Sequence, residues 1–302
     1  MISSLGKREE LAAQLQSART DGGAYLLPPR LLVRLSGSDA FRYLNGQITR
    51  DLARLSEKEA LPACILTAKG KLSAPLLIRR SGDDLLVEAD PSLEEALLAR
   101  LDRYIVADEV TLAVEPPETQ EIIHLFGAMV SIECSGIKVS RLGVPGLDVE
   151  RNLLSEDLQL LNPTVIETLR IERGIPVWGR EMSEETLPPE VGFDRTHIDY
   201  DRGCYPGQET ISRLKSIGRV RRLLHSLRSS PGIPLHAGMQ ILDGEKKQIG
   251  TISSASEQFD AGSWVALALL SRETTEPLFA SDTLGVLTEA TTPISILGKY
   301  GS

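Results

Sequence analysis

The sequence predicts an α+β protein that ends in an all-β domain. Helical and strand-like apolar patterns are interleaved up to about residue 220, and from about residue 222 only short strands with turn residues between them follow. A chain of 302 residues is long enough for two or three domains. We therefore expect a boundary near residue 220, between a mixed domain 1–220 and a domain 221–302 that has the texture of a small β-barrel or sandwich.

Helices and strands before this boundary are predicted from apolar spacing and capping residues. Four helices are expected, within 8–18 (Leu11, Leu15 and Ala18 inward), 38–46 (capped by Ser38 or Asp39), 90–104 (begun by Asp90 and Pro91, with Leu97, Leu101 and Tyr104 inward) and 162–174 (capped by Asn162, ended by Gly174). Strands are expected in LLVRL (31–35), CILTA (64–68), LSAPLLIRR (72–80), LLVEA (85–89), EIIHLFG (121–127) and IKVSRLG (137–143).

The last part of the chain has a different texture. Short strands are expected in LLHSLRSS (223–230), in MQILDGEKKQIGTISSAS (239–256), in SWVALALL (263–270) and in LGVLTEA (284–290). Between the two parts, residues 175–200 carry little regular pattern, and such long segments are either functional or disordered. Their aromatic residues and paired prolines favour an ordered segment.

Composition excludes several classes of protein. The formal net charge is −9, which argues against a general nucleic-acid binder. No apolar run approaches the ~20 residues that span a bilayer. The N-terminal residues lack the apolar core of a secretory signal, so a cytoplasmic location and no membrane partner are expected.

Three cysteines lie far apart in the sequence, at positions 64, 134 and 204. Without clustered ligands, and with only four scattered histidines, they predict no structural metal site. Cys64 and Cys134 lie in strand-like apolar surroundings and are expected to fill the core. Cys204 lies instead in DRGCYPGQE (201–209), between glycine and proline residues.

The turn around Cys204 has the features of a reactive thiol. Gly203 and Gly207 permit close approach of a ligand, and Arg202 or the start of a helix near Gly207 can stabilise a thiolate. A half-buried turn cysteine is the alternative. A Cys204–His197 nucleophile is disfavoured, because sequence separation does not imply contact.

Basic residues are concentrated between residues 202 and 228, interrupted only by Glu209. They are Arg202, Arg213, Lys215, Arg219, Arg221, Arg222 and Arg228. This stretch is either a cationic face for a polyanionic tail or an anionic partner, or an ordinary solvated surface.

RGCYPGQE closely resembles the Lys-Gly-Cys-Tyr-x-Gly-Gln-Glu signature of the YgfZ-type folate-binding proteins, relatives of the glycine cleavage T-protein, an aminomethyltransferase. LSGSDAFRYLNGQITRDL, LRIERGIPVWGREMSEETLPPEVGFD and IGTISSAS also resemble segments of that family, in the same order. Together they span most of the chain. The resemblance implies a GcvT-like fold of two intertwined α+β lobes around a central folate-sized cavity, with a C-terminal β-barrel.

The resemblance also implies a ligand and partners. The ligand is tetrahydrofolate, and the role is to support assembly or maintenance of iron–sulfur clusters in client enzymes, including one that modifies tRNA. We expect a monomer without strong direct nucleic-acid binding. The single thiol could be a transient cluster ligand, a persulfide carrier or a redox group, and the sequence leaves these open.

Site residues are carried over by position. Cys204 is the signature thiol, with Arg202 where the family prefers Lys; an Arg cannot act as an amine nucleophile or base. Glu190 matches the acid that faces the pterin, whose adjacent amide and amino groups suit a carboxylate. The remaining expected contacts are Tyr205, Gln208, Glu209, aromatic walls from Trp178, Phe193 and Tyr205, and Arg213 or Arg222 for the anionic tail.

One absence separates an accessory protein from a folate-dependent one-carbon transferase. Transfer to folate needs an acid or base near the reacting nitrogens. The T-protein family has an aspartate after a glycine-rich turn, where TAKGKLSAPL places Ser73 and Ala74. Neither can do this work, so we favour the accessory protein and keep the transferase as the alternative.

Overall fold

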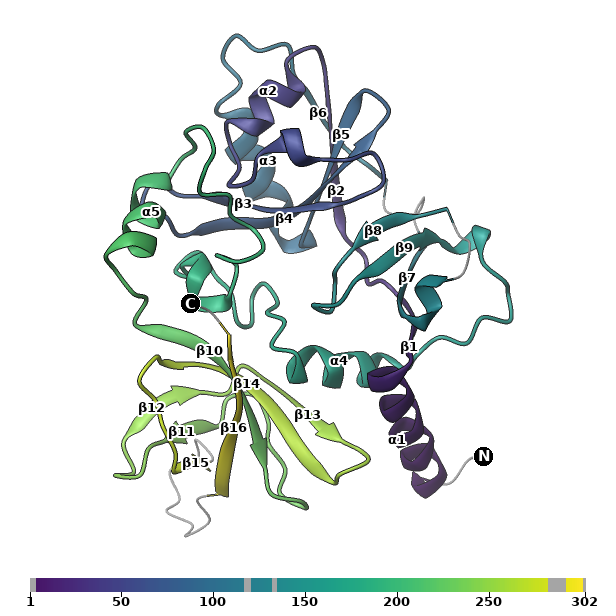
Figure 1. Cartoon of the computed structure of the whole chain (residues 1–302), viewed down its shortest axis with the longest axis vertical. Coiled ribbons are helices and arrows are strands. Elements are labelled where there is room, and N and C mark those ends of the chain that lie inside the picture. Colours follow the sequence, from purple (N-terminus) through teal and green to yellow (C-terminus); the bar gives the residue numbers. More distant parts are fainter. Residues whose placement is uncertain (1–3, 117–120, 132–134, 282–291, 301–302) are drawn as a thin grey trace.

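The computed structural model describes residues 4–116, 121–131, 135–281 and 292–300, which form three antiparallel sheets (Figure 1). The first sheet has the order β3-β4-β5-β2-β6. Its strands are β2 (Leu31–Ser36), β3 (Leu61–Leu66), β4 (Leu72–Ser81), β5 (Asp84–Ala89) and β6 (Thr111–Val114). Two helices, α2 (Ala40–Asn45) and α3 (Glu94–Asp102), cover one face, and their apolar side chains bury Val33, Leu35 and Ile78.

The second sheet has the order β1-β7-β9-β8. Its strands are β1 (Gly22–Leu26), β7 (Ile122–Gly127), β8 (Ile137–Val139) and β9 (Gly146–Glu150). Because β1 pairs with β7, the chain leaves this sheet, builds the whole first sheet and returns. The two lobes are therefore intertwined. Helices α1 (Ser4–Thr20) and α4 (Pro163–Glu172) pack together through Leu11, Leu15 and Leu169.

The third sheet has seven strands, in the order β12-β11-β15-β16-β10-β14-β13. They are β10 (Arg222–Ser229), β11 (Gln240–Leu242), β12 (Gln248–Thr251), β13 (Ser254–Gln258), β14 (Ser263–Ser271), β15 (Leu278–Ser281) and β16 (Thr292–Tyr300). It curls until Gly250 lies against Leu270, but in the described residues the edge strands β12 and β13 are not hydrogen-bonded to each other. The predicted closed barrel is therefore not confirmed.

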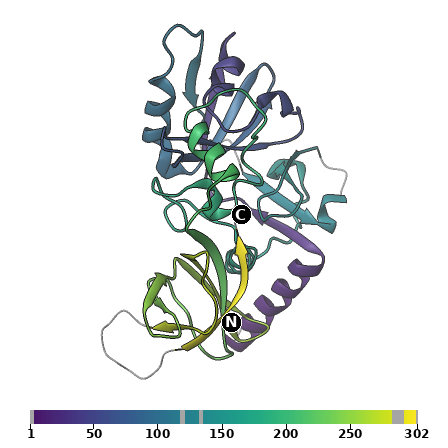
Figure 2. The same cartoon turned by 60° about the vertical axis from the view of Figure 1, so that its left-hand side comes forward.

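Residues 175–207 lie between the three sheets, and helix α5 (Gln208–Ser216) lies at the edge of the molecule, beside β3 and β4 (Figure 1; Figure 2 shows the same segment from another side). Cys64 and Leu72 of the first lobe, Tyr205 of this segment and Leu224 of the third sheet bury one another in a shared apolar cluster. The expectation of an ordered segment is thus confirmed. Short 3-10 helices complete the fold at η1 (Leu52–Arg54), η2 (Pro91–Leu93), η4 (Ala128–Ser131), η5 (Arg151–Leu153) and η6 (Pro188–Val191).

Most predicted elements form, with two local corrections. Tyr104 is not part of the buried face of α3, because the helix ends at Asp102; its ring is exposed and lies under the Arg100 guanidinium. Neither predicted cap of α2 acts on the helix: Asp39 accepts from the Glu109 backbone N–H instead, and Ser38 donates to the Glu109 side chain. The cap at Asn162 is confirmed, since its side chain accepts from Thr164 N at 2.9 Å.

Some predictions cannot be compared with this structure. The expected burial of Cys134 and the expected strand at 284–290 lie outside the described residues. Within the part of the chain that the structure describes, no helix is long and apolar enough to cross a membrane.

Candidate functional site

The Cys204 turn is fastened to the first lobe by its neighbour Arg202. The guanidinium donates to three carbonyl oxygens at the end of α2 and just beyond, those of Asn45, Ile48 (3.0 Å) and Arg50. Burial lowers the pKa of Arg202, opposed mainly by the nearby Asp51. The donors of Arg202 therefore hold the start of the turn against the first lobe.

A second contact fixes the start of the same turn. Asp199 is buried, accepts from the Asp51 backbone N–H at 2.9 Å and pairs with Arg50 and Arg54, both at 3.0 Å. The backbone between these two anchors cannot move away from the first lobe without breaking them. Cys204 itself is exposed. The result is a free thiol on a rigidly held turn.

The other cysteine of the described chain is a contrast within the same region. Cys64 is completely buried on β3, and burial raises the pKa of its thiol. A buried thiol with a raised pKa stays protonated and unreactive. The prediction that Cys64 fills the core is therefore confirmed.

The remaining signature residues differ in exposure. Tyr205 is buried, burial raises its pKa to about 12, and its hydroxyl has no hydrogen-bond partner among the described residues. Gln208 donates to the Arg202 carbonyl at 3.3 Å, which links α5 back to the turn. Glu209 is exposed in the first turn of α5. Of the three, only Tyr205 offers a buried polar atom to a ligand.

Glu190 and Arg222, expected to contact opposite ends of folate, form an ion pair. Arg222 Nε lies 3.1 Å from Glu190 Oε1, and Glu190 Oε2 accepts from Leu187 N at 2.9 Å. Glu190 is buried in η6, whereas the Arg222 side chain is 50% exposed. A carboxylate has about four acceptor positions, so these contacts leave room for further donors.

The expected aromatic walls lie in the central segment. Trp178 is half-buried between the core of the first lobe and the central apolar cluster. Phe193 is buried and stacks on His197, with ring centroids 3.7 Å apart. Burial, helped by Arg50, lowers the pKa of His197 to about 3, so this imidazole is neutral at pH 7. Its Nδ1 lies 2.7 Å from Thr196 Oγ1.

Ser73 and Ala74, the residues that stand where the T-protein family has an aspartate, lie at the start of β4. Ala74 points into the core of the first lobe, and Ser73 is half-buried on the opposite face. Glu185 is a carboxylate near the turn before β4 that the sequence did not reveal. It forms an ion pair with Lys71, directly before the strand. Glu185 is 78% exposed and already holds that cation. Sequence distance hid the pair, because 114 residues separate the partners.

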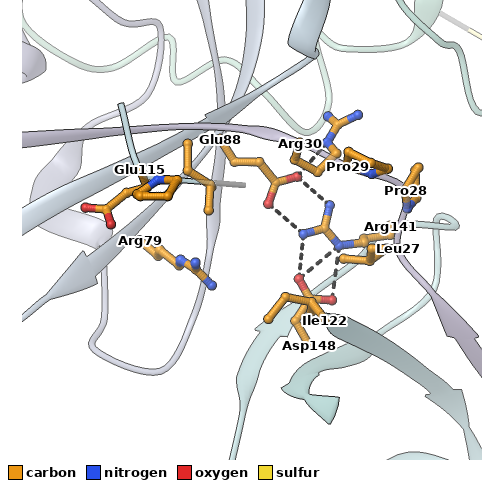
Figure 3. A pocket seen from close by; sticks show the side chains of 12 residues that line it. Leu27, Pro28, Pro29, Arg30, Arg79, Glu88, Glu115, Ile122, Arg141 and Asp148 are labelled. Carbon is orange, nitrogen blue, oxygen red and sulfur yellow. Dashed lines mark hydrogen bonds and ion pairs between the residues drawn. The ribbon is translucent and has the colours of Figure 1, made fainter. Parts of the chain in front are cut away.

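A polar cluster between the two lobes was not predicted (Figure 3). Arg141 donates to Glu88 of β5 at 2.7 Å and to Asp148 of β9, so one guanidinium bridges the two sheets. Asp148 Oδ1 also lies 2.7 Å from His124 Nδ1. Burial alone would lower the pKa of Arg141, but the two carboxylates raise it above its ordinary value. A cavity of about 40 Å³ adjoins the cluster.

A second cavity, of about 500 Å³, lies between Leu125 of β7 and residues 153–159. None of the predicted site residues lines this cavity or the one beside Arg141. The folate cavity implied by the family therefore stays a prediction. Within the described ranges, no group of three His, Cys, Asp or Glu residues could hold a metal ion.

The chain is similar to proteins of known name. It is 27% identical over 257 residues to the tRNA-modifying protein YgfZ of Escherichia coli O45:K1 (strain S88 / ExPEC), covering 74% of this chain and 78% of that protein. It is also 27% identical over 254 residues to the tRNA-modifying protein YgfZ of Shigella boydii serotype 4 (strain Sb227), with the same coverage. No protein-family model matches the chain.

The fold is similar to that of a solved structure. The glycine cleavage system aminomethyltransferase T from Bartonella henselae superposes with a TM-score of 0.76, over 95% of this chain and 88% of that one, at 15% sequence identity. The predicted resemblance to YgfZ-type proteins and the GcvT-like fold are thereby confirmed.

Proposed function

We propose that this chain is a folate-binding accessory protein that supports assembly or repair of iron–sulfur clusters in client enzymes, including one that modifies tRNA. The observation that carries the proposal is an exposed thiol, Cys204, on a turn held by Arg202 and Asp199. A thiol for reaction with a partner must be accessible and positioned, and this one is both. A monomer and a cytoplasmic location belong to the same proposal.

The residues present fit a pterin. Glu190 is a buried acceptor with unused lone pairs, and Tyr205 has a buried hydroxyl without a partner in the described structure. Trp178 and Phe193 add flat apolar surface from the same segment. When bound, tetrahydrofolate would supply one-carbon or redox chemistry of its own.

Each side chain would have a separate task. Glu190 would accept from the amide and amino groups of the pterin edge, while the Tyr205 hydroxyl would regain a hydrogen bond. Gln208 and Glu209 would stay near the thiol turn as its polar surroundings. Arg213, exposed on α5, would meet the anionic tail, and Arg222 would keep its ion pair with Glu190.

The alternative function is a folate-dependent one-carbon transferase. It needs a positioned acid or base, typically worth about 10²- to 10⁴-fold in rate. Ser73 cannot supply this at neutral pH, and Ala74 faces the core. Glu185 is exposed and paired with Lys71, which makes it a poor substitute. These observations favour binding without turnover.

The test is a titration of the purified chain with tetrahydrofolate, followed by incubation with dimethylglycine, sarcosine or the aminomethyl-lipoyl carrier. We expect binding and no methylenetetrahydrofolate. Glu190→Gln should weaken binding about 10- to 100-fold, because it removes a charged acceptor. Glu185→Gln, in the same segment but exposed, is the matched control and should bind normally.

Two results would overturn the proposal. Turnover above background would favour the transferase. No binding by the folded wild-type chain would remove both folate functions.

A further inference from the structure

Within the described structure, the segment directly after α5 carries two arginines that form no ion pair with a carboxylate. Exposed Arg8, Arg42 and Arg180 each contact a carboxylate of the chain. Arg219 and Arg221 are exposed and have no such contact among the described residues. Acidic residues outnumber basic ones by 42 to 33, so a shortage of acids does not explain this.

An apolar side chain lies in the middle of these cations. Ile217, directly after α5, is 88% exposed. Lys215, Arg219 and Arg221 are exposed as well, while Val220 is buried. We call Lys215, Ile217, Arg219 and Arg221 the docking patch. An exposed apolar residue flanked along the chain by exposed cations has the composition of a recognition surface, with an apolar anchor and a polar rim.

We infer that the docking patch binds a partner protein whose surface places carboxylates around an apolar pocket. Charge complementarity favours an acidic partner, and the isoleucine needs an apolar counterpart that a phosphate backbone lacks. RNA binding commonly adds stacking aromatic rings. The ring of Tyr200, which the patch contacts, is covered by the Lys215 ammonium, 3.7 Å from the ring centroid.

A second copy of this chain fits the patch less well. Val106 is also 88% exposed, and acidic residues surround it. However, Asp108 is already paired with Arg42, and Glu109 accepts from Ser38 at 2.8 Å. That surface also carries the exposed cations Arg42 and Arg103, which would repel Arg219 and Arg221.

The location of the docking patch connects it to the thiol. Helix α5 lies at the edge of the molecule (Figure 1). Its nine residues separate Cys204 from Ile217 along the chain. Nine helical residues span about 14 Å. An interface of about 800 Å² per partner is roughly 30 Å across, so one interface can cover both. The inference rests on the proposed function in this respect: the docked partner would be the client that Cys204 serves.

A pair of matched variants tests the docking patch in cells that depend on the chain for an iron–sulfur enzyme. Ile217→Asp should lower complementation at least about tenfold, the effect of losing an interface anchor. Val106→Asp changes an equally exposed apolar residue and should complement fully. Both variants should keep the wild-type melting temperature and tetrahydrofolate affinity. Full complementation by Ile217→Asp would overturn the inference.

A photo-crosslinking residue at position 217 of the full chain identifies what binds. We expect an adduct with an iron–sulfur enzyme, about tenfold weaker after Arg219→Glu with Arg221→Glu, and no such adduct from position 106. Adducts only with RNA or with a second copy would overturn the inference. The folate titration distinguishes the two proposals, because a wild-type chain that binds no folate but crosslinks at 217 would remove only the proposed function.

Discussion

Two polar regions of this molecule hold arginine residues in opposite ways. In the cluster between the lobes, Arg141 is surrounded by Glu88 and Asp148, and all three side chains are largely removed from water. Around the Cys204 turn, Arg202 binds backbone carbonyls instead, and Arg219 and Arg221, directly beyond α5, contact no carboxylate in the described structure. The first region satisfies its charges internally, whereas the second leaves a thiol and cations facing solvent.

The difference separates residues that hold the lobes together from residues that can act on something else. Arg141, Glu88 and Asp148 use their charges on one another, so their conversion to neutral residues should act first on stability. Cys204 contributes little to packing because it is exposed. Its replacement should act on function alone.

The largest expected effect is at Arg141. Arg141→Met removes the cation that Glu88 and Asp148 share and leaves Glu88 with Arg30 alone. Loss of one partner from a buried ion pair typically costs about 3–5 kcal/mol of unfolding free energy. Arg219→Met, in the exposed region, should stay within about 0.5 kcal/mol of wild type. Urea denaturation of both variants measures the difference. Equal stabilities would show that the lobes do not depend on this bridge.

The next effect concerns acid. Burial opposes the ionisation of Glu88, but Arg141 and Arg30 lower its pKa to about 2, from an ordinary value of 4.5. This stabilisation is present above about pH 4.5 and is lost as the pH falls toward 2. At about 1.4 kcal/mol per pKa unit, the wild type should lose roughly 3 kcal/mol more than Glu88→Gln between pH 6 and pH 2. Parallel stability curves for the two proteins would contradict the lowered pKa.

A smaller effect is expected at Arg202, which shares features of both regions. Arg202→Met removes donors to four carbonyl oxygens, three in the first lobe and that of Gly203, and should cost about 1–3 kcal/mol. Arg202→Lys keeps a cation that can reach part of this set and should recover at least half of the loss. Thermal unfolding gives the order wild type, Lys, Met. A Lys variant as unstable as Met would mean that the planar guanidinium is essential to the turn.

Much of the fold could be predicted from local patterns. Helix α4 follows from Asn162 and Pro163, and the β3–β4 hairpin from the turn at 69–71, because caps and tight turns are set by neighbouring residues. The asparagine cap formed as predicted. Asp39 did not cap, since a backbone N–H seventy residues away in sequence competed for its carboxylate.

The site was less predictable, because its contacts join distant parts of the chain. Family resemblance pointed to Glu190 and Arg222, but not to their pairing across 32 residues. The Glu88–Arg141–Asp148 bridge gave no local signal at all, since each residue lies on a different strand or loop. The closed barrel was inferred from the short strands together with the family resemblance, and hydrogen bonding between edge strands cannot be deduced from either.

The most direct test of the account is Cys204→Ser in cells whose iron–sulfur enzyme activity depends on this chain. The substitution replaces one exposed sulfur atom, so stability should change by less than about 1 kcal/mol, as at other sites outside the core. We predict that the folded variant binds tetrahydrofolate normally and restores none of the iron–sulfur enzyme activity. Full restoration of that activity by Cys204→Ser would contradict the central claim, because the thiol would then have no part in the function.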